Sequence, residues 1–341
     1  MPWQGMQNIG LEKLLKAWQI VKQGEPEQAL QCVTIAQPEP GAGELSIAVA
    51  AAGVGLPDLL MCRGRYEYQP ALPFTPGQEV AGRVVAAGAG VKLRPGQRVM
   101  GVTCFYNGQG GFAEQCMSTP DMVYGVPDEM PDEQAAGFVI PWHTAWIGLV
   151  SRARIRAGER LLVLGAAGGS GGAALSLGKA LGAEVIAAVG DEAKQAHCRR
   201  LGADHILNYQ QQDITAYCNE LSGGRGVDVV FDPVGGQLSD EVVGCIASAG
   251  RLLLIGFASG QWSRAPSHQL VMRNCSALGV FVGAYSPRQR RRVNTELLRL
   301  YRAGRINPGV DRVLEFNQTP VALADLAARR ACGKTVIRVS G

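Results

Sequence analysis

Residues 161–181 read LLVLGAAGGSGGAALSLGKAL, and this stretch decides the fold of the chain. Its first four residues are apolar and short enough for a buried strand, five glycines follow within eight positions, and the remainder is rich in alanine and leucine. A strand, a glycine-rich turn and a helix in this order form a phosphate cradle, because glycines admit a close approach of the backbone and a helix N-terminus offers free N–H groups. The spacing of Ala166, Gly168 and Gly171 fits the dinucleotide-binding pattern, with alanine at its first position.

The composition is that of an ordinary globular protein. The chain has 341 residues, of which 47% are hydrophobic and 18% charged, which suits about two domains. The formal net charge of +4 suits an anionic cofactor but does not by itself predict nucleic-acid binding. Nine cysteines without a CxxC pair indicate free thiols in a reducing, cytoplasmic compartment. Glycine and serine interrupt the charge-free run between Arg160 and Lys179, so no membrane span is predicted.

The pattern of the chain changes near Pro131. Beyond an N-terminal extension over residues 1–15, β-branched runs alternate with Pro-Gly turns, which is typical of a small all-β domain. Strands and helices then alternate, which predicts a parallel sheet covered on both faces. Strands are expected at 161–164, 184–189, 206–209, 227–231, 251–256 and 277–283, with helices at 170–181, 191–201 and 236–247 between them. The predicted fold class is α/β, with a β-rich domain over 16–140 and 284–341 and a six-stranded, doubly wound (Rossmann) domain over 141–283.

The end of the second strand of such a domain indicates the type of cofactor. An acidic residue there usually binds the ribose hydroxyls of NAD, whereas this strand ends in Val189 and Gly190, and Asp191 comes slightly later. Asp191 is expected to cap the next helix rather than to bind ribose. Lys194 suits the 2′-phosphate of NADPH, and the alternative is a solvent-facing helix lysine. NADPH is therefore favoured over NADH.

The order of motifs resembles the medium-chain dehydrogenase/reductase superfamily, and within it the zinc-free quinone oxidoreductase (zeta-crystallin-like) branch. The motifs run through most of the chain and are GVGLPDLLMCRGRY (53–66), PFTPGQEVAG (73–82), GGFAE (110–114), HTAW (143–146), GAAGGSGG (165–172), LGADHILNY (201–209), VDVVFDPVGG (227–236), GRLLLIGFASG (250–260) and GKTVIRV (333–339). The resemblance implies a GroES-like substrate domain beside the Rossmann domain. It also implies hydride transfer from NADPH to a quinone or an α,β-unsaturated carbonyl, and a homodimer formed through strand 277–283.

The resemblance also implies a set of cofactor-binding residues. They would hold the pyrophosphate, the 2′-phosphate end and the nicotinamide ribose, and they are Ala166, Ala167, Gly168, Gly169, Ser170, Gly171, Gly190, Lys194, Tyr209, Thr144, Phe257, Ala258, Ser259 and Phe281. Tyr209 is equally well explained as an aromatic packed at the rim.

On the substrate side, Tyr66 would face the acceptor and donate a hydrogen bond or a proton, and a structural aromatic is the alternative for Tyr66. Thr144, which would flank the ribose and nicotinamide, is the second catalytic candidate. Gly55 stands where relatives carry an asparagine, which opens space at the reacting centre. His143 is a candidate substrate contact, although a histidine on such a helix more often packs in the core.

No metal is expected. Zinc-dependent relatives carry a cysteine near 57–58, a histidine before the glutamate of their Gly-His-Glu segment, and a loop with four cysteines. This chain has Pro57-Asp58, Gln78 before Glu79, and only Cys104 in the corresponding region.

Two alternatives remain, a second enzymatic reaction and a role from another functional class. Enoyl-thioester reduction would require a basic cleft, and none is readable from the sequence. A non-enzymatic RNA-binding or structural role would draw on the basic run 288–292, RQRRR, which lacks interleaved aromatics and is more simply a solvated helix start. A nucleic-acid partner is therefore not expected.

Overall fold

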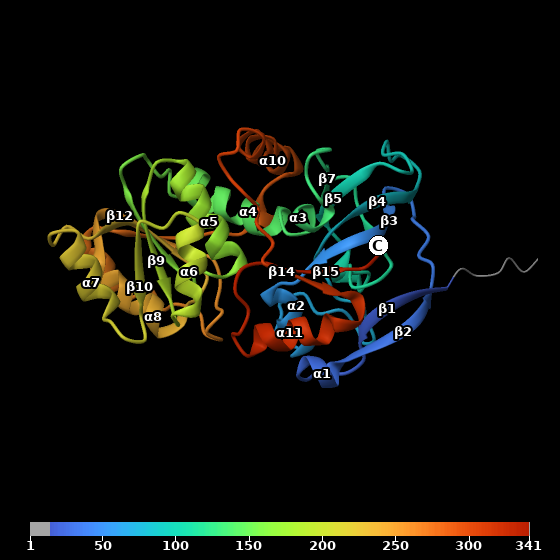
Figure 1. Ribbon diagram of the computed structural model, residues 1–341, viewed down its shortest axis with the longest axis horizontal. Helices are drawn as coiled ribbons and strands as arrows, with labels where there is room; N and C mark the ends of the chain where they lie inside the picture. Colours follow the sequence, from blue (N-terminus) through green and yellow to red (C-terminus); the bar gives the residue numbers. More distant parts are fainter. Residues whose placement is uncertain (1–13, 341) are drawn as a thin grey trace, which may run out of the picture.

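Two β-sheets of different construction organise the chain, and the computed structural model describes them over residues 14–340 (Figure 1). The predicted extension over residues 1–15 lies outside the described residues except for its last two, which open the strand β1 (Leu14–Ile20). In Figure 1 the sheet rich in parallel strands occupies the left lobe and the other sheet the right lobe, with the helices α3 (Asp132–Ala136), α4 (Val139–Trp146) and α10 (Pro287–Arg302) between them.

The left lobe is a doubly wound parallel sheet, as predicted. Its strands are β8 (Arg160–Leu164), β9 (Glu184–Val189), β10 (His205–Asn208), β11 (Val227–Asp232), β12 (Ile246–Leu254) and β13 (Ser276–Gly279). Their order is β10-β9-β8-β11-β12-β13, and every neighbouring pair is parallel. The helices α5 (Gly169–Ala180), α6 (Ala193–Arg200), α7 (Ile214–Leu221), α8 (Gly236–Glu241) and α9 (Ser267–Arg273) connect them. From β8 the chain adds β9 and β10 on one side and then β11, β12 and β13 on the other, so the strand order reverses between β8 and β11. Doubly wound folds bind their ligands at this switch point.

Three details of this lobe differ from the prediction. Strand β13 ends at Gly279, and residues 282–284 form a 3-10 turn instead of continuing the strand to 283. Strand β12 begins at Ile246, inside the helix predicted for 236–247, and Ala249 breaks its regularity with a φ of 60°. Helices α7 and α9 were not predicted.

The right lobe is mostly antiparallel. Its main sheet contains β14 (Arg312–Glu315), β15 (Thr335–Arg338), β3 (Leu45–Gly53), β4 (Glu79–Ala87), β5 (Arg98–Val102) and β7 (Val123–Gly125) in that order, and β6 (Gln115–Ser118) pairs with β3. A separate hairpin joins β1 to β2 (Leu30–Ala36), and α1 (Pro26–Ala29), α2 (Leu56–Cys62) and α11 (Thr319–Ala327) complete the lobe. The C-terminal strands β14 and β15 return to this sheet, as the sequence predicts.

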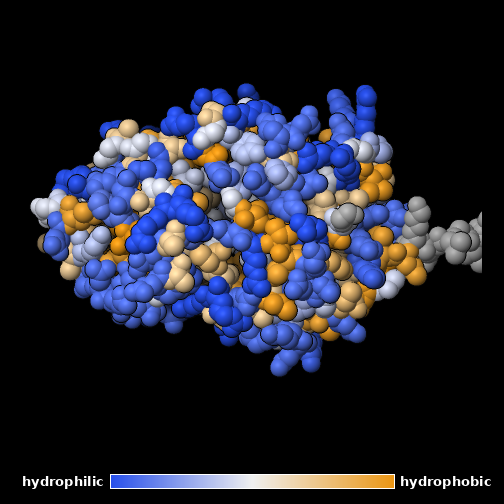
Figure 2. Space-filling view, in the orientation of Figure 1, coloured by the Kyte–Doolittle hydropathy of each residue, from blue (hydrophilic) through white to orange (hydrophobic). Residues whose placement is uncertain are grey.

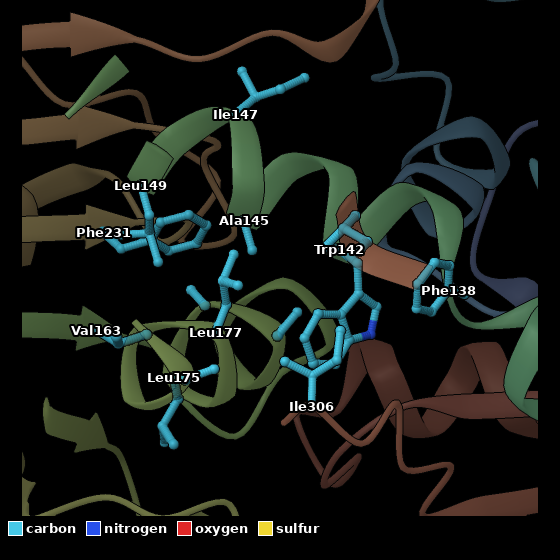
Figure 3. Packing of buried hydrophobic residues seen from close by; sticks show 14 of the residues in the cluster. Phe138, Trp142, Ala145, Ile147, Leu149, Val163, Leu175, Leu177, Phe231 and Ile306 are labelled. Carbon is cyan, nitrogen blue, oxygen red and sulfur yellow. The ribbon is translucent and has the colours of Figure 1, made fainter. Parts of the chain in front are cut away.

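One cluster of buried apolar residues extends from the interior of one lobe into the interior of the other (Figure 3). Phe138 and Trp142 stack at a centroid distance of 6.0 Å on the right-lobe side, and Leu149 packs near Phe231 of β11 on the left. Leu177 of α5 lies in the same cluster, below α4. Because close-packed interiors resist displacement, α4 fixes α5 relative to the right lobe.

The face shown in Figure 2 is largely hydrophilic over the left lobe. Apolar side chains gather over β14 and α11, where Val313 and Val321 are exposed. No helix within residues 14–340 is long and apolar enough to cross a membrane.

Candidate functional site

The glycine-rich turn between β8 and α5 is shaped for close approach of a ligand. Gly165 has a φ of 58°, a conformation that only glycine adopts readily, and Gly168 caps the N-terminus of α5. A Cβ at Gly171 would lie 2.3 Å from the Gly165 carbonyl oxygen, so no side chain fits there. The first-turn N–H groups of α5, from Gly169 to Gly171, have no partner within the helix. The turn therefore offers backbone donors and a partial positive charge at the C-terminal edge of the sheet.

A second group of predicted residues gathers at the end of β9. A Cβ at Gly190 would lie 2.7 Å from the Tyr209 hydroxyl, so Gly190 leaves open the space that this tyrosine borders. The Asp191 carboxylate accepts a hydrogen bond from the Lys194 backbone at 3.0 Å and lies 2.8 Å from the Lys194 ammonium. Asp191 thus holds the start of α6, as predicted. The pKa of Asp191 is below its usual value because the hydrogen bonds and charge of Lys194 outweigh its partial desolvation.

The predicted residues after β12 lie in a loop that is hydrogen-bonded to the loop after β11. Ala258 and Ser259 donate backbone hydrogen bonds to the carbonyls of Pro233 and Val234, at 3.1 and 2.8 Å, which joins the loops that follow β11 and β12. The Phe257 ring packs against Trp262 at a centroid distance of 4.5 Å. Phe281 lies beyond β13 with 58% of its surface exposed.

In the right lobe, one buried carboxylate joins two loops. Asp58 is 1% exposed and accepts hydrogen bonds from the backbone N–H groups of Gly55, Gly77 and Gln78 at 2.9, 3.2 and 3.1 Å. Burial raises the pKa of Asp58 to about 6 despite these donors and the nearby charge of Lys334. Asp58 therefore fixes Gly55 beside the turn that carries Gln78.

Tyr66 lies against the same turn. Its ring is half-buried and packs near Tyr68 and Phe105, at centroid distances of 6.3 and 6.2 Å. Desolvation raises the pKa of the Tyr66 phenol, and a hydrogen bond with Gln78 partly opposes that rise. The phenol is consequently protonated at neutral pH and can act as a donor.

A buried ion pair connects this turn to the start of α4 and to the C-terminal strand. The Lys334 ammonium lies 3.1 Å from Glu79, which is 1% exposed, and 3.3 Å from the Val54 carbonyl oxygen. Glu79 accepts a hydrogen bond from the Ile140 N–H at 2.9 Å, and the Thr144 hydroxyl donates to the Ile140 carbonyl at 2.7 Å. The Lys334 stem passes 3.6 Å from the position of a Cβ on Gly169. Thr144 is thereby linked through α4 to the contact between the two lobes.

His143 has a different environment from the other predicted residues. It is fully buried, its Nε2 lies 3.2 Å from Asn294 Oδ1 on α10, and its ring packs near Tyr124 at a centroid distance of 5.2 Å. Burial lowers the pKa of His143 to about 4. The side chain has no exposed surface to offer a substrate, and we assign it a packing role.

Asp58, Gln78 and Lys334 are site residues that the sequence reasoning did not select. The signal was a charged or amide residue inside an apolar motif, as in PFTPGQEVAG and GKTVIRV. Such residues are buried only when they are paired or hydrogen-bonded, so their presence in apolar strands indicates a polar network.

A glycine-rich strand–turn–helix on a doubly wound sheet, facing a second lobe with a buried polar network, defines an α/β protein with one Rossmann-type lobe and one mainly antiparallel lobe. The chain matches the family of the alcohol dehydrogenase GroES-like domain over residues 41–128 and that of the zinc-binding dehydrogenase over residues 169–301. It is 32% identical to quinone oxidoreductase-like protein 2 of Mus musculus, over 94% of both chains.

Solved structures give the same result. A probable oxidoreductase from Mycobacterium abscessus has a TM-score of 0.85 at 33% identity, covering 96% of this chain and 100% of the other. The Escherichia coli quinone oxidoreductase, solved as a complex with NADPH, has a TM-score of 0.86 at 26% identity, covering 95% and 100%. The chain belongs to the medium-chain dehydrogenase/reductase superfamily, in its quinone oxidoreductase-like branch, and is an oxidoreductase.

Proposed function

We propose that this oxidoreductase transfers hydride from NADPH to a quinone or an α,β-unsaturated carbonyl without using zinc. The observation that carries the proposal is the contact between the cradle and the right lobe. Gly169 of the cradle lies against Lys334, which is paired with Glu79, the residue next to Gln78. An acceptor held near Gln78 and Tyr66 would therefore lie close to a cofactor anchored on α5.

The residues of the left lobe fit the phosphates of NADPH. The backbone of Gly168, Gly169, Ser170 and Gly171 would hold the pyrophosphate, with Ala166 and Ala167 forming the floor of the turn. Gly190 and Lys194 would receive the 2′-phosphate end, beside Tyr209. Thr144 and the residues Phe257, Ala258, Ser259 and Phe281 would border the ribose and nicotinamide. The NADPH complex of the similar Escherichia coli enzyme supports this choice of cofactor.

The protein's own part in the chemistry is to orient the acceptor and to protonate its oxygen. Bound NADPH supplies a hydride. Reduction of the acceptor leaves negative charge on its oxygen, and Tyr66, a protonated phenol, is the group available to donate a hydrogen bond or proton to it. Gly55 leaves room beside Asp58 for a bulky acceptor.

The side chains at the positions of the zinc ligands of zinc-dependent relatives support catalysis without zinc. Asp58 stands near the position of the cysteine ligand in zinc-dependent relatives, and its carboxylate already accepts three backbone hydrogen bonds. Gln78 replaces their histidine with a neutral amide, which is not a usual zinc ligand. Across residues 14–340, histidine, cysteine and acidic side chains nowhere form a group of three that could hold a metal ion.

We also propose that two copies of the chain associate through the edge strand β13. Within residues 14–340 this strand pairs only with β12, and the neighbouring Val271, Met272 and Phe281 are 73%, 82% and 58% exposed. An edge next to exposed apolar side chains is typical of an interface.

The first experiment is to follow oxidation of NADPH and of NADH by absorbance, with a panel of quinones and enones and with a chelator present. We expect turnover with NADPH that the chelator does not reduce. The Gly171→Ala variant should lose turnover because its Cβ would clash with Gly165, whereas the control Gly125→Ala, with no atom within 4 Å of its Cβ, should retain it. Nucleotide binding without reduction of any acceptor would refute the reaction, and activity that the chelator abolishes would refute zinc independence.

A further inference from the structure

Three aromatic side chains, which we term the aromatic row, lead from the proposed reacting centre to the surface of the right lobe. They are Tyr66, Phe105 and Tyr106, and their ring centroids are 6.2 Å apart from Tyr66 to Phe105 and 5.7 Å apart from Phe105 to Tyr106. Tyr66 and Phe105 are half-buried and pack on the apolar core of this lobe, whereas Tyr106 is 36% exposed. A continuous apolar surface therefore extends from the Tyr66 ring to solvent.

The turn that carries the outer two rings is fixed by backbone hydrogen bonds. Residues Phe105–Asn107 form a 3-10 turn, which Gly108 closes with a φ of 79° and an N–H that donates to the Phe105 carbonyl at 2.9 Å. The Gly108 carbonyl accepts a hydrogen bond from the Thr75 N–H at 2.9 Å. The turn is thus joined to the segment that continues to Gln78, beside the proposed acceptor site.

The outermost ring is also held by its own hydroxyl. The Tyr106 hydroxyl donates to Sγ of Cys104, a fully buried residue, at 3.6 Å. Neighbouring rings that meet edge to face attract one another, and an aromatic side chain loses little conformational entropy when it is ordered. The aromatic row is therefore formed before an acceptor arrives, so binding an apolar group along it costs little ordering of the protein.

The orientation of the rings indicates the shape of the group that fits them. The planes of Tyr66 and Phe105 are inclined by 54°, and those of Phe105 and Tyr106 by 81°. Rings inclined in this way share no flat face, so a rigid planar ligand could stack on one of them only. A flexible apolar chain, in contrast, can bend over each ring in turn and bury the apolar surface of all three.

We propose that the aromatic row is a subsite for a flexible apolar arm on the acceptor, and that the preferred acceptors are quinones with an isoprenoid side chain. The inference rests on the proposed reduction of quinones beside Tyr66. In this arrangement the quinone ring lies at Tyr66, and its arm passes over Phe105 towards Tyr106. The arm takes no part in the chemistry, so the aromatic row determines affinity and specificity rather than the rate of hydride transfer.

The test uses one dimethoxy-methyl benzoquinone ring, either without an arm or with an arm of two isoprenoid units, in steady-state kinetics with NADPH. We expect the unaltered chain to have a kcat/KM about tenfold higher for the armed quinone. Tyr106→Ala should lower kcat/KM about tenfold for the armed quinone, through KM, and less than twofold for the unarmed one. Tyr106→Phe keeps the ring and should keep the preference.

Tyr68 offers a matched control. Its ring is 49% exposed and lies 6.3 Å from that of Tyr66, but it is outside the proposed path of the arm. Tyr68→Ala should therefore change kcat/KM by the same factor for both quinones, because any effect acts through Tyr66. A loss confined to the armed quinone in Tyr68→Ala would overturn the assignment of the arm to Phe105 and Tyr106.

Geraniol, an isoprenoid alcohol without a quinone ring, gives a second measurement that does not depend on any variant folding. With the unaltered chain it should compete with the armed quinone and leave KM for the unarmed quinone unchanged. Equal competition against both quinones, or equal losses for both in Tyr106→Ala, would overturn the inference while leaving quinone reduction intact. A chain that reduces neither quinone would refute the proposed reaction and the inference with it.

Discussion

At the scale of single residues, Gly55 sets the space at the proposed reacting centre. Its φ of −138° is open to any residue, and a Cβ there would lie 3.3 Å from Pro57 and 3.5 Å from Asp58. We expect Gly55→Asn to fold with a stability change of less than about 1 kcal/mol. Its added amide should lower KM for small quinones and raise KM for bulky ones, by roughly tenfold, corresponding to about 1.4 kcal/mol. Steady-state kinetics with acceptors of graded size would check this, and a variant that shifts KM equally for every acceptor would contradict it.

His143 provides a residue-scale prediction about pH. Its pKa is about 4 in the folded protein, below the value near 6.5 of an exposed histidine, so the folded state binds fewer protons than the unfolded state in this range. Its contribution to stability is therefore complete above about pH 6.5 and is lost as the pH falls towards 4. Relative to His143→Gln, the free energy of unfolding of the unaltered chain should fall by up to about 3 kcal/mol over that interval. Urea unfolding at a series of pH values would measure the difference, and a gap that does not vary with pH would refute the prediction.

At the scale of elements, the pair Glu79–Lys334 joins β4, β15 and the start of α4. Lys334→Met would leave the Glu79 carboxylate buried without its cation, and we expect a loss of about 3 kcal/mol in the free energy of unfolding. Adding Glu79→Gln should restore part of that loss, because the amide oxygen can still accept the hydrogen bond from Ile140. Denaturant unfolding of the two single variants and the double variant would give the coupling energy. Additive losses would show that the pair does not act as a unit.

The sequence predicts secondary-structure elements best where a short apolar run is bounded by turn residues. The strands of the Rossmann sheet are mostly apolar runs, and four of the six, β8 to β11, begin and end within one residue of the predicted bounds. Helix α7 was missed although Asp213 caps it by accepting a hydrogen bond from Ala216. Strand β13 was expected to be longer than it is, because hydrophobicity alone does not show where pairing with β12 stops.

At the scale of the whole molecule, the two lobes and the return of the C-terminal strands follow from the sequence, whereas the contact between the lobes does not. Asp58, Gln78 and Lys334 come from distant parts of the chain, and nothing local reveals that Lys334 lies beside both Glu79 and Gly169. Conversely, His143 was a candidate from its neighbourhood in sequence, but the packing of α10 on α4 buries it. Long-range packing, which no periodicity encodes, decides these positions.

The proposed dimer is a property of the whole molecule. Helix α9 carries Val271 and Met272, which are 73% and 82% exposed, beside the edge strand β13, and burying such side chains against a second copy would stabilise association by roughly 1 kcal/mol or more for each. Val271→Lys together with Met272→Glu should raise the dissociation constant at least tenfold, or about 1.4 kcal/mol, without changing the net charge. Val321→Lys, an exposed position on α11 in the other lobe, is the control and should leave the dimer intact. Sedimentation velocity at micromolar concentration would measure the oligomeric state. A monomeric unaltered chain would refute the dimer, and a double variant that stays dimeric would show that the interface lies elsewhere. If β13 does pair with its copy, the two sheets become one continuous sheet, and its exposed edge is protected from unspecific pairing.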